Sequence, residues 1–176
     1  MRLINTVLIW ILLTTQVSSA EYLYIFNEKC ITELYGEAKE TINDGDISII
    51  KHSQGITLRF ELKNPIEEYK KISSETYKKI LLTEYFLSKI KNLAIIEVHT
   101  EGLKDFRNLS PKNWEISTVI ANNIEAVIIG GRYGLNHSRI HSVGYGEFMP
   151  SKNTPNKGSH CPNHVDIIIL CNINGE

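Results

Sequence analysis

The residues best suited to bind a ligand are three consecutive polar side chains, His99, Thr100 and Glu101, which follow a largely apolar run at positions 93–98. Val, Ile and Leu favour a buried strand, and the Glu-Gly pair at 101–102 ends it, so the polar residues should lie where the strand becomes a loop. The carboxyl end of a strand is a natural place to receive a ligand. A carboxylate at this position can accept hydrogen bonds from an ammonium group. The sequence therefore predicts a ligand site centred on Thr100 and Glu101.

Some of these positions also raise the alternative of zinc chemistry. His99 and Glu101 match the His-x-Glu of zinc deaminases, but the Pro-Cys-x-x-Cys that completes the signature is absent from the sequence. His160, Cys161 and His164 offer imidazole and thiolate groups at close spacing, yet we interpret them as an exposed loop with one disulfide cysteine. No Ser-His-Asp arrangement or phosphate-binding glycine loop falls on suitable elements. We therefore predict a protein that is not an enzyme, with no catalytic residue, metal site or cofactor, and keep a zinc-binding enzyme as an alternative.

The first elements that position this site follow from hydrophobic spacing. Alternating apolar residues over 47–62, around a Ser-Gln-Gly turn, predict two strands. Ser73 and Ser74 predict the start of a helix that runs to about residue 90. An apolar stripe at three-to-four spacing should face the sheet. Its predicted members are Tyr77, Leu81, Leu82, Tyr85, Phe86 and Ile90.

The second half of the chain completes the predicted fold. A helix is expected from about 114 to 129, ended by two glycines, and strands at 139–143 and 165–170. The last strand is apolar apart from Asp166 and should be interior. This order predicts an α+β fold, a two-layer sandwich with helices packed on one face of a mixed sheet. A short helix near 31–42 would belong to an N-terminal extension, residues 21–44, packed on a domain at 45–176.

Four segments follow one another along the chain: the strand end at 93–101, a segment at 113–121 that begins Asn-Trp-Glu-Ile-Ser, a segment at 138–150 that ends Gly-Tyr-Gly-Glu-x-x-Pro, and a glycine-bearing loop into 164–170. In this order and spacing they resemble the OmpA/MotB C-terminal family, the peptidoglycan-associating domain of bacterial envelope proteins. The second is close to the Asn-Trp-Glu-Leu-Ser of the MotB branch, and the third is the most specific. The resemblance covers roughly 47–170. It implies the OmpA-like fold and non-covalent association with peptidoglycan in a Gram-negative envelope.

The resemblance also implies a ligand, although the residues match it only in part. In the family, the strand end reads Gly-His-Thr-Asp, and the Asp acts with an Arg of the following helix to hold the zwitterionic end of diaminopimelate. Here Glu101 stands for the Asp and Ile120 for the Arg. Val98 replaces the glycine, and Pro-Asn-His at 162–164 replaces the Asn-Arg-Arg of the last loop. Glu101 keeps the negative charge, whereas Ile120 cannot bind a carboxylate.

A guanidinium would therefore have to come from elsewhere, from Arg107 or Arg132. Thr100 and Asn113 are the secondary candidates, because the start of the second helix should face the polar end of the strand. Glycines 144 and 146 are interpreted as architectural. The ligand contacts implied by the resemblance are Glu101, Thr100, Asn113 and Arg107.

The first 20 residues have the pattern of a secretory signal peptide. A basic start precedes an apolar centre, and small residues stand at Ser18 and Ala20. We expect cleavage after Ala20, because the apolar part is shorter than the ~20 residues that span a bilayer. An uncleaved anchor is the alternative. The mature chain would then carry no transmembrane span.

The three cysteines should meet an oxidising compartment in an exported protein. One bridge and one leftover thiol are expected. Cys161 and Cys171 flank the last predicted strand at opposite ends and would be too far apart to bridge. Cys30 should therefore pair with one of them.

Composition bounds the remaining possibilities. The 176 residues, 42% of them hydrophobic, suffice for one domain and a short extension. Nineteen basic against 20 acidic residues give a net charge of -1, so the positive field that nucleic acid requires is missing. We predict a periplasmic or outer-membrane-associated protein with peptidoglycan, or envelope proteins, as partners. Two functions stay open: peptidoglycan association, weakened by the missing arginine, and a degenerate OmpA-like scaffold of a secretion or motility assembly.

Overall fold

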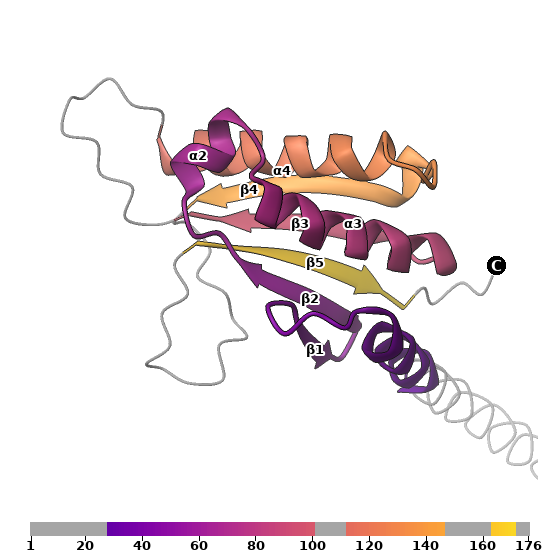
Figure 1. Ribbon diagram of the computed structural model, residues 1–176. Coiled ribbons are helices and arrows are strands. Elements are labelled where there is room, and N and C mark those ends of the chain that lie inside the picture. The colour runs from indigo at the N-terminus through magenta and orange to yellow at the C-terminus, as the bar shows by residue number, and fades with distance from the viewer. Residues whose placement is uncertain (1–27, 101–111, 147–162, 172–176) are drawn as a thin grey trace, which may run out of the picture.

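The computed structural model describes residues 28–100, 112–146 and 163–171 (Figure 1). Residues 28–41 are helical. The helices that follow are α2 (Pro65–Lys70), α3 (Ser74–Lys89) and α4 (Asn113–Ile129), with a short 3-10 turn, η1 (His137–Arg139). The strands are β1 (Ser48–His52), β2 (Gly55–Glu61), β3 (Ala94–His99), β4 (Ile140–Gly146) and β5 (His164–Leu170).

The five strands form one mixed sheet in the order β1-β2-β5-β3-β4. β3 and β4 are parallel, whereas the other neighbouring pairs are antiparallel. The last strand, β5, therefore lies in the middle of the sheet, between β2 and β3 (Figure 1). This position confirms the prediction of an interior strand.

One face of the sheet is apolar and is covered by the helices. Alternate residues of the three central strands point to this face and are at most 1% exposed: Ile56, Leu58, Phe60, Ala94, Ile96, Val98, Val165, Ile167 and Ile169. Lys79 of α3 lies over the ring of Phe60, and the α4 backbone at Thr118 lies against Gly144 of β4. Both long helices thus lie on the same face, which confirms the predicted α+β arrangement.

Local signals set the helix ends. The Ser73 hydroxyl accepts a hydrogen bond from the Thr76 N–H at 3.2 Å and caps α3, as expected. Gly130 ends α4, also as predicted. The guanidinium of Arg139 donates to the carbonyl oxygens of Ile90 and Asn92 at 2.8 and 3.0 Å. Arg139 therefore ties the residues that follow α3 to the start of β4.

The predicted sheet-facing stripe of α3 is wrong in part. Tyr77, Leu81 and Tyr85 are 44%, 38% and 39% exposed. The helix instead buries Lys79 and Glu84, at 3% and 0% exposure, together with apolar neighbours. The spacing of apolar residues did not indicate this face, because it assigns charged residues to the surface and here two of them are buried beside partners. The Lys79 ammonium contacts the Glu75 carboxylate at 3.1 Å, and Glu84 accepts a hydrogen bond from the backbone N–H at position 133.

The N-terminal helical segment belongs to the same hydrophobic core. Leu34, Ala38 and Ile42 are at most 5% exposed and cluster with the sheet residues. A disulfide joins Cys30 to Cys171, across a sequence separation of 141 residues, which confirms that Cys30 forms the bridge. The predicted signal peptide and Cys161 lie outside the described residues. Among the residues that are described, no helix is long and apolar enough to cross a membrane.

Candidate ligand site at the carboxyl end of β3

Thr100 joins three elements at the point where β3 ends. Its hydroxyl donates to the carbonyl oxygen of Asn113, the first residue of α4, at 2.8 Å. Its backbone N–H donates to the carbonyl oxygen of Gly146, the last residue of β4, at 3.2 Å. The residue is fully buried. Thr100 therefore fixes the strand end, the helix start and the end of β4 relative to one another.

The two glycines of β4 allow the start of α4 to approach the sheet. Gly146 has a φ of +56°, and a Cβ at this residue would lie 2.7 Å from the backbone nitrogen of Trp114. Its N–H donates to the hydroxyl of Ser117 at 2.9 Å. A Cβ on Gly144 would overlap the backbone of Ser117 and Thr118. Both glycines are thus architectural, as the sequence indicated.

The first turn of α4 presents exposed groups beside this joint. The Glu115 carboxylate accepts a hydrogen bond from the Lys112 N–H at 2.6 Å and so caps the start of the helix. The indole of Trp114 is 44% exposed, and the Lys112 side chain is exposed as well. An aromatic ring and a cation therefore stand next to the end of β3.

The structure brings together two of the four predicted ligand contacts, Thr100 and Asn113. Glu101 and Arg107 lie outside the described residues. Arg132 follows the far end of the 17-residue α4, about 25 Å from its start, so this arginine cannot supply the missing guanidinium. Ile120, a residue of α4, is fully buried in the hydrophobic core. Of the two arginines considered, only Arg107 remains as a candidate.

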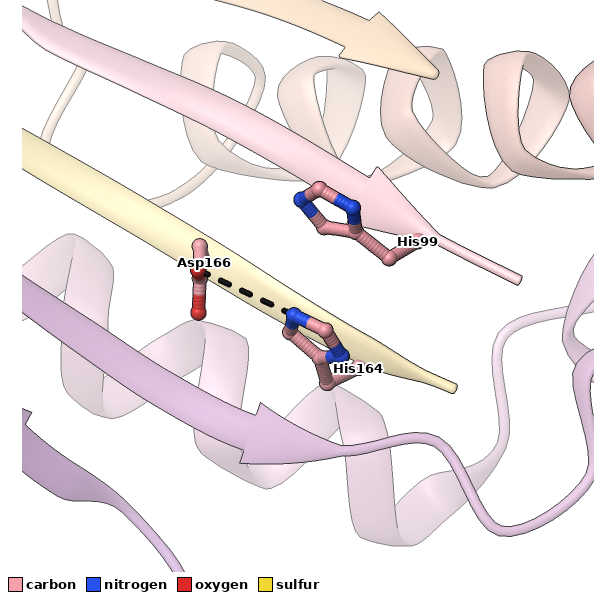
Figure 2. Close-up of side chains that lie close together, drawn as sticks. All are labelled: His99, His164 and Asp166. Carbon is pink, nitrogen blue, oxygen red and sulfur yellow. Dashed lines mark ion pairs between the residues drawn. The ribbon is translucent and has the colours of Figure 1, made fainter. Parts of the chain in front are cut away.

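A second polar cluster, on the opposite face of the sheet from α3 and α4, was missed by the sequence analysis. His164 is the first residue of β5 and is 3% exposed, so its assignment to an exposed loop was wrong. Its imidazole stacks on that of His99 of β3, with ring centroids 4.5 Å apart and planes 8° from parallel. Figure 2 shows both rings and Asp166 on one side of the two strands. A search for polar residues two apart on predicted neighbouring strands could have found this group.

Charged and aromatic partners surround the cluster. Arg59 of β2 donates two hydrogen bonds to the two carboxylate oxygens of Asp166, at 2.6 and 2.5 Å. Tyr145 of β4 stacks on His99, with centroids 5.3 Å apart, and its hydroxyl donates to Glu97 at 3.4 Å. Burial raises the pKa of Tyr145 above its usual value, and the nearby Glu97 carboxylate raises this pKa further. One polar network therefore spans four strands.

Comparison with solved structures identifies the fold. A MotB-like protein from Desulfovibrio vulgaris is similar, with a TM-score of 0.65, 16% identity, and 89% of this chain and 96% of the other covered. The cell wall anchor of the type VI secretion system from Pseudomonas aeruginosa gives 0.58 and 13%, covering 79% and 97%. An outer membrane protein from Borrelia burgdorferi gives 0.53 and 26%, covering 73% and 100%. No family profile and no curated protein sequence matches the chain. These likenesses show that the domain has the OmpA/MotB-like fold that the sequence motifs indicated.

Proposed function

We propose that this protein is a non-catalytic domain of the bacterial envelope that associates non-covalently with peptidoglycan, through the diaminopimelate of the stem peptide. It would be exported and would act in the periplasm or at the outer membrane. The observation that carries the proposal is the joint of Thr100, Asn113 and Gly146, which holds the end of β3 against the start of α4. The similarity to a protein described as a cell wall anchor supports the same function.

The chemistry of the site would depend on the residue that follows this joint. Glu101 is the next residue after Thr100, so its carboxylate is the group proposed to bind the ammonium of diaminopimelate. Ile120 is fully buried and offers no charge, which leaves the ligand carboxylate to Arg107. Without a cation, the loss of one charge-assisted contact would weaken binding by about 2–5 kcal/mol, and each ~1.4 kcal/mol is a tenfold change in affinity. Association is therefore expected to be weak unless Arg107 binds the ligand carboxylate.

The proposal can be tested by sedimentation of the purified chain with isolated sacculi. We expect co-sedimentation that free diaminopimelate competes away, and that Glu101→Ala and Arg107→Ala each reduce. Glu37→Ala is the matched control, because Glu37 is an exposed acid on the N-terminal helix and its removal changes the net charge equally. A folded chain that stays in the supernatant, or a Glu101→Ala variant that sediments like Glu37→Ala, would contradict the proposal.

A second candidate function is a scaffold or protein-interaction module of an envelope secretion or motility assembly. The observation in its favour is the exposed stripe of α3, formed by Tyr77, Leu81 and Tyr85. Tyr133, itself 44% exposed, packs beside Tyr85 with ring centroids 5.5 Å apart and widens the stripe. Large exposed apolar patches commonly mark interaction sites. A folded chain that does not bind sacculi would favour this function.

A further inference from the structure

We propose that Glu97, His99, His164 and Asp166 form a binding site for a divalent transition-metal ion, with Zn²⁺ the best fit. The site is separate from the joint at Thr100 and does not rest on the peptidoglycan proposal. It lies on the face of the sheet opposite to α3 and α4, where β3 and β5 run side by side (Figure 2).

The backbone itself brings the four side chains together. β3 contributes Glu97 and His99, and β5 contributes His164 and Asp166. In the antiparallel register, Glu97 is opposite Asp166 and His99 is opposite His164. Residues two apart on a strand share a face, and directly opposed residues have Cβ atoms about 4.5–5.5 Å apart. The grouping therefore follows from strand register and does not depend on one side-chain rotamer.

Three of the four donor groups lie close to one another, and the fourth, Glu97, lies next to His99. One potential ligand atom from each of His99, His164 and Asp166 lies within 4.8 Å of the others. The Nε2 of His164 is 3.8 Å from the Oδ2 of Asp166, and the Nε2 of His99 is 3.7 Å from the Oε2 of Glu97. Ligand atoms of a tetrahedral Zn²⁺ lie about 3.3 Å apart, since each stands about 2.0–2.2 Å from the ion. The groups need shifts of about an ångström, and the parallel rings must tilt, which the broad χ2 wells of histidine permit.

The surroundings match what metal ligands usually have. Ligating carboxylates are commonly held by outer hydrogen bonds that orient them. Here Arg59 holds Asp166 through two hydrogen bonds, and the Tyr145 hydroxyl donates to one oxygen of Glu97, whose other oxygen faces His99. The Asp166 Oδ2 that faces His164 also accepts from Arg59, so a metal ion would share this oxygen with the guanidinium. Two imidazoles and two carboxylates are a ligand set that suits Zn²⁺.

The charge of the group also favours a cation. Two carboxylates and the guanidinium of Arg59 sum to one negative charge when both imidazoles are neutral. The side chains of Arg59, His99, His164 and Asp166 are only 11%, 6%, 4% and 8% exposed, so water would screen the attraction between the carboxylates and a bound cation only weakly. Protonation of one of the two imidazoles is the competing way to neutralise this charge, whereas protonation of both would place two like charges in stacking contact. The two possibilities predict different responses to metal.

The experiment is a titration of the full chain with Zn²⁺ by calorimetry, after removal of metal with a chelator. Cys161→Ser serves as the background, so that the third cysteine contributes no thiolate. We expect one ion per chain, bound more weakly as the pH falls, because both imidazoles must be deprotonated to bind. His164→Gln should weaken binding by about tenfold to a hundredfold or more. His137→Gln is the matched control, since His137 is exposed in η1, which precedes β4 at the far end of the sheet from His99.

A second measurement needs no variant of the cluster. X-ray absorption of the Zn²⁺-loaded chain should show two imidazole ligands and oxygen donors without sulfur, and Co²⁺ should give the visible spectrum of a tetrahedral complex. Circular dichroism in chelator checks that each variant is folded. If His164→Gln does not fold, Glu97→Gln replaces it, because the Glu97 side chain is 21% exposed. Absence of binding, an equal affinity of His164→Gln and His137→Gln, or an ion with no imidazole ligands would each overturn the proposal.

Discussion

The two faces of the central strands differ in the interactions that stabilise their buried side chains. On the side of α3 and α4, Ile96, Val98 and Ile167 are fully buried among apolar side chains, where non-directional burial of apolar area stabilises them. On the other side, His164 and Asp166 are at most 5% exposed and belong to a network of stacked rings and charge-assisted hydrogen bonds.

Substitutions on the apolar face should therefore act through side-chain volume, and substitutions on the polar face should act through charge and hydrogen bonding. An apolar face tolerates similar side chains of similar volume. A buried polar network depends on each member, because removal of one partner leaves the other without compensation. The predictions that follow test this distinction.

Asp166→Ala should have the largest effect. The variant leaves the guanidinium of Arg59 buried without its carboxylate, which should lower the free energy of unfolding by about 3–5 kcal/mol. Urea unfolding followed by circular dichroism, in chelator, measures the change. The double variant Arg59→Met with Asp166→Leu should recover much of the loss, because an apolar pair of similar volume needs no compensation.

An exposed ion pair supplies the control for this result. Lys63 and Glu75 are in contact at 2.8 Å, but their side chains are 65% and 46% exposed. Lys63→Ala should leave the urea midpoint unchanged within error, because solvent screens such a pair. A similar loss in Lys63→Ala and Asp166→Ala would show that burial of the polar face does not strengthen its contacts.

Two consecutive residues of β5 compare the two faces directly. Ile167 points to the helices and is fully buried, whereas Ile168 points to the opposite face and is only partly buried. Ile167→Ala should lower the free energy of unfolding by about 2–5 kcal/mol through lost burial and a residual cavity. Ile168→Ala should cost about 1 kcal/mol. Equal losses would mean that both faces exclude water from apolar groups to the same degree.

The apolar face was the part of the fold that the sequence could predict. The apolar residues of β5 and the alternation in β2 identified strands, and the strand expected at 139–143 is β4, which continues through Gly144 and Tyr145 to Gly146. Periodicity failed on α3, where Lys79 is buried beside Glu75 of the same helix and Glu84 is buried beside the backbone N–H at position 133. A pattern of hydrophobicity cannot distinguish a buried charge with a partner from an exposed one.

The spacing of hydrophobic residues did not reveal the polar face, because its members meet only through strand pairing. Glu97 and His99 are more than sixty residues from His164 and Asp166, and only the antiparallel pairing of β3 with β5 places them together. The start of α4 lies at the polar end of β3, as expected, because Thr100 donates to the carbonyl oxygen of Asn113. The ligand contacts proposed for Thr100, Asn113, Glu101 and Arg107 stay predictions.

Alanine substitutions at two glycines, one packed against α4 and one exposed, should change the stability in opposite directions. Gly144→Ala should destabilise the protein by about 1–3 kcal/mol, because the new Cβ would overlap the α4 backbone at Ser117 and Thr118. Gly36→Ala, at an exposed position in the N-terminal helix with nothing within 4 Å, should stabilise it by about 0.5–1 kcal/mol. Thermal unfolding of both variants measures the shifts. A Gly144→Ala variant as stable as the parent would show that α4 moves away from β4 without cost.

The smallest expected effect is alkaline sensitivity on the polar face. Burial, and then the Glu97 carboxylate, raise the pKa of Tyr145 above the ordinary value of 10.0. The folded state therefore keeps the phenol proton at a pH where the unfolded chain loses it. This contribution to stability is fully present below pH 10 and disappears as the pH rises through the pKa of the folded state.

Because other tyrosines and lysines also titrate in this range, the informative quantity is the difference between the wild type and Tyr145→Phe. We expect urea unfolding to show the wild type losing stability more steeply than Tyr145→Phe above about pH 10. Parallel curves for the two proteins would place the Tyr145 hydroxyl in water, outside the network that begins at Arg59.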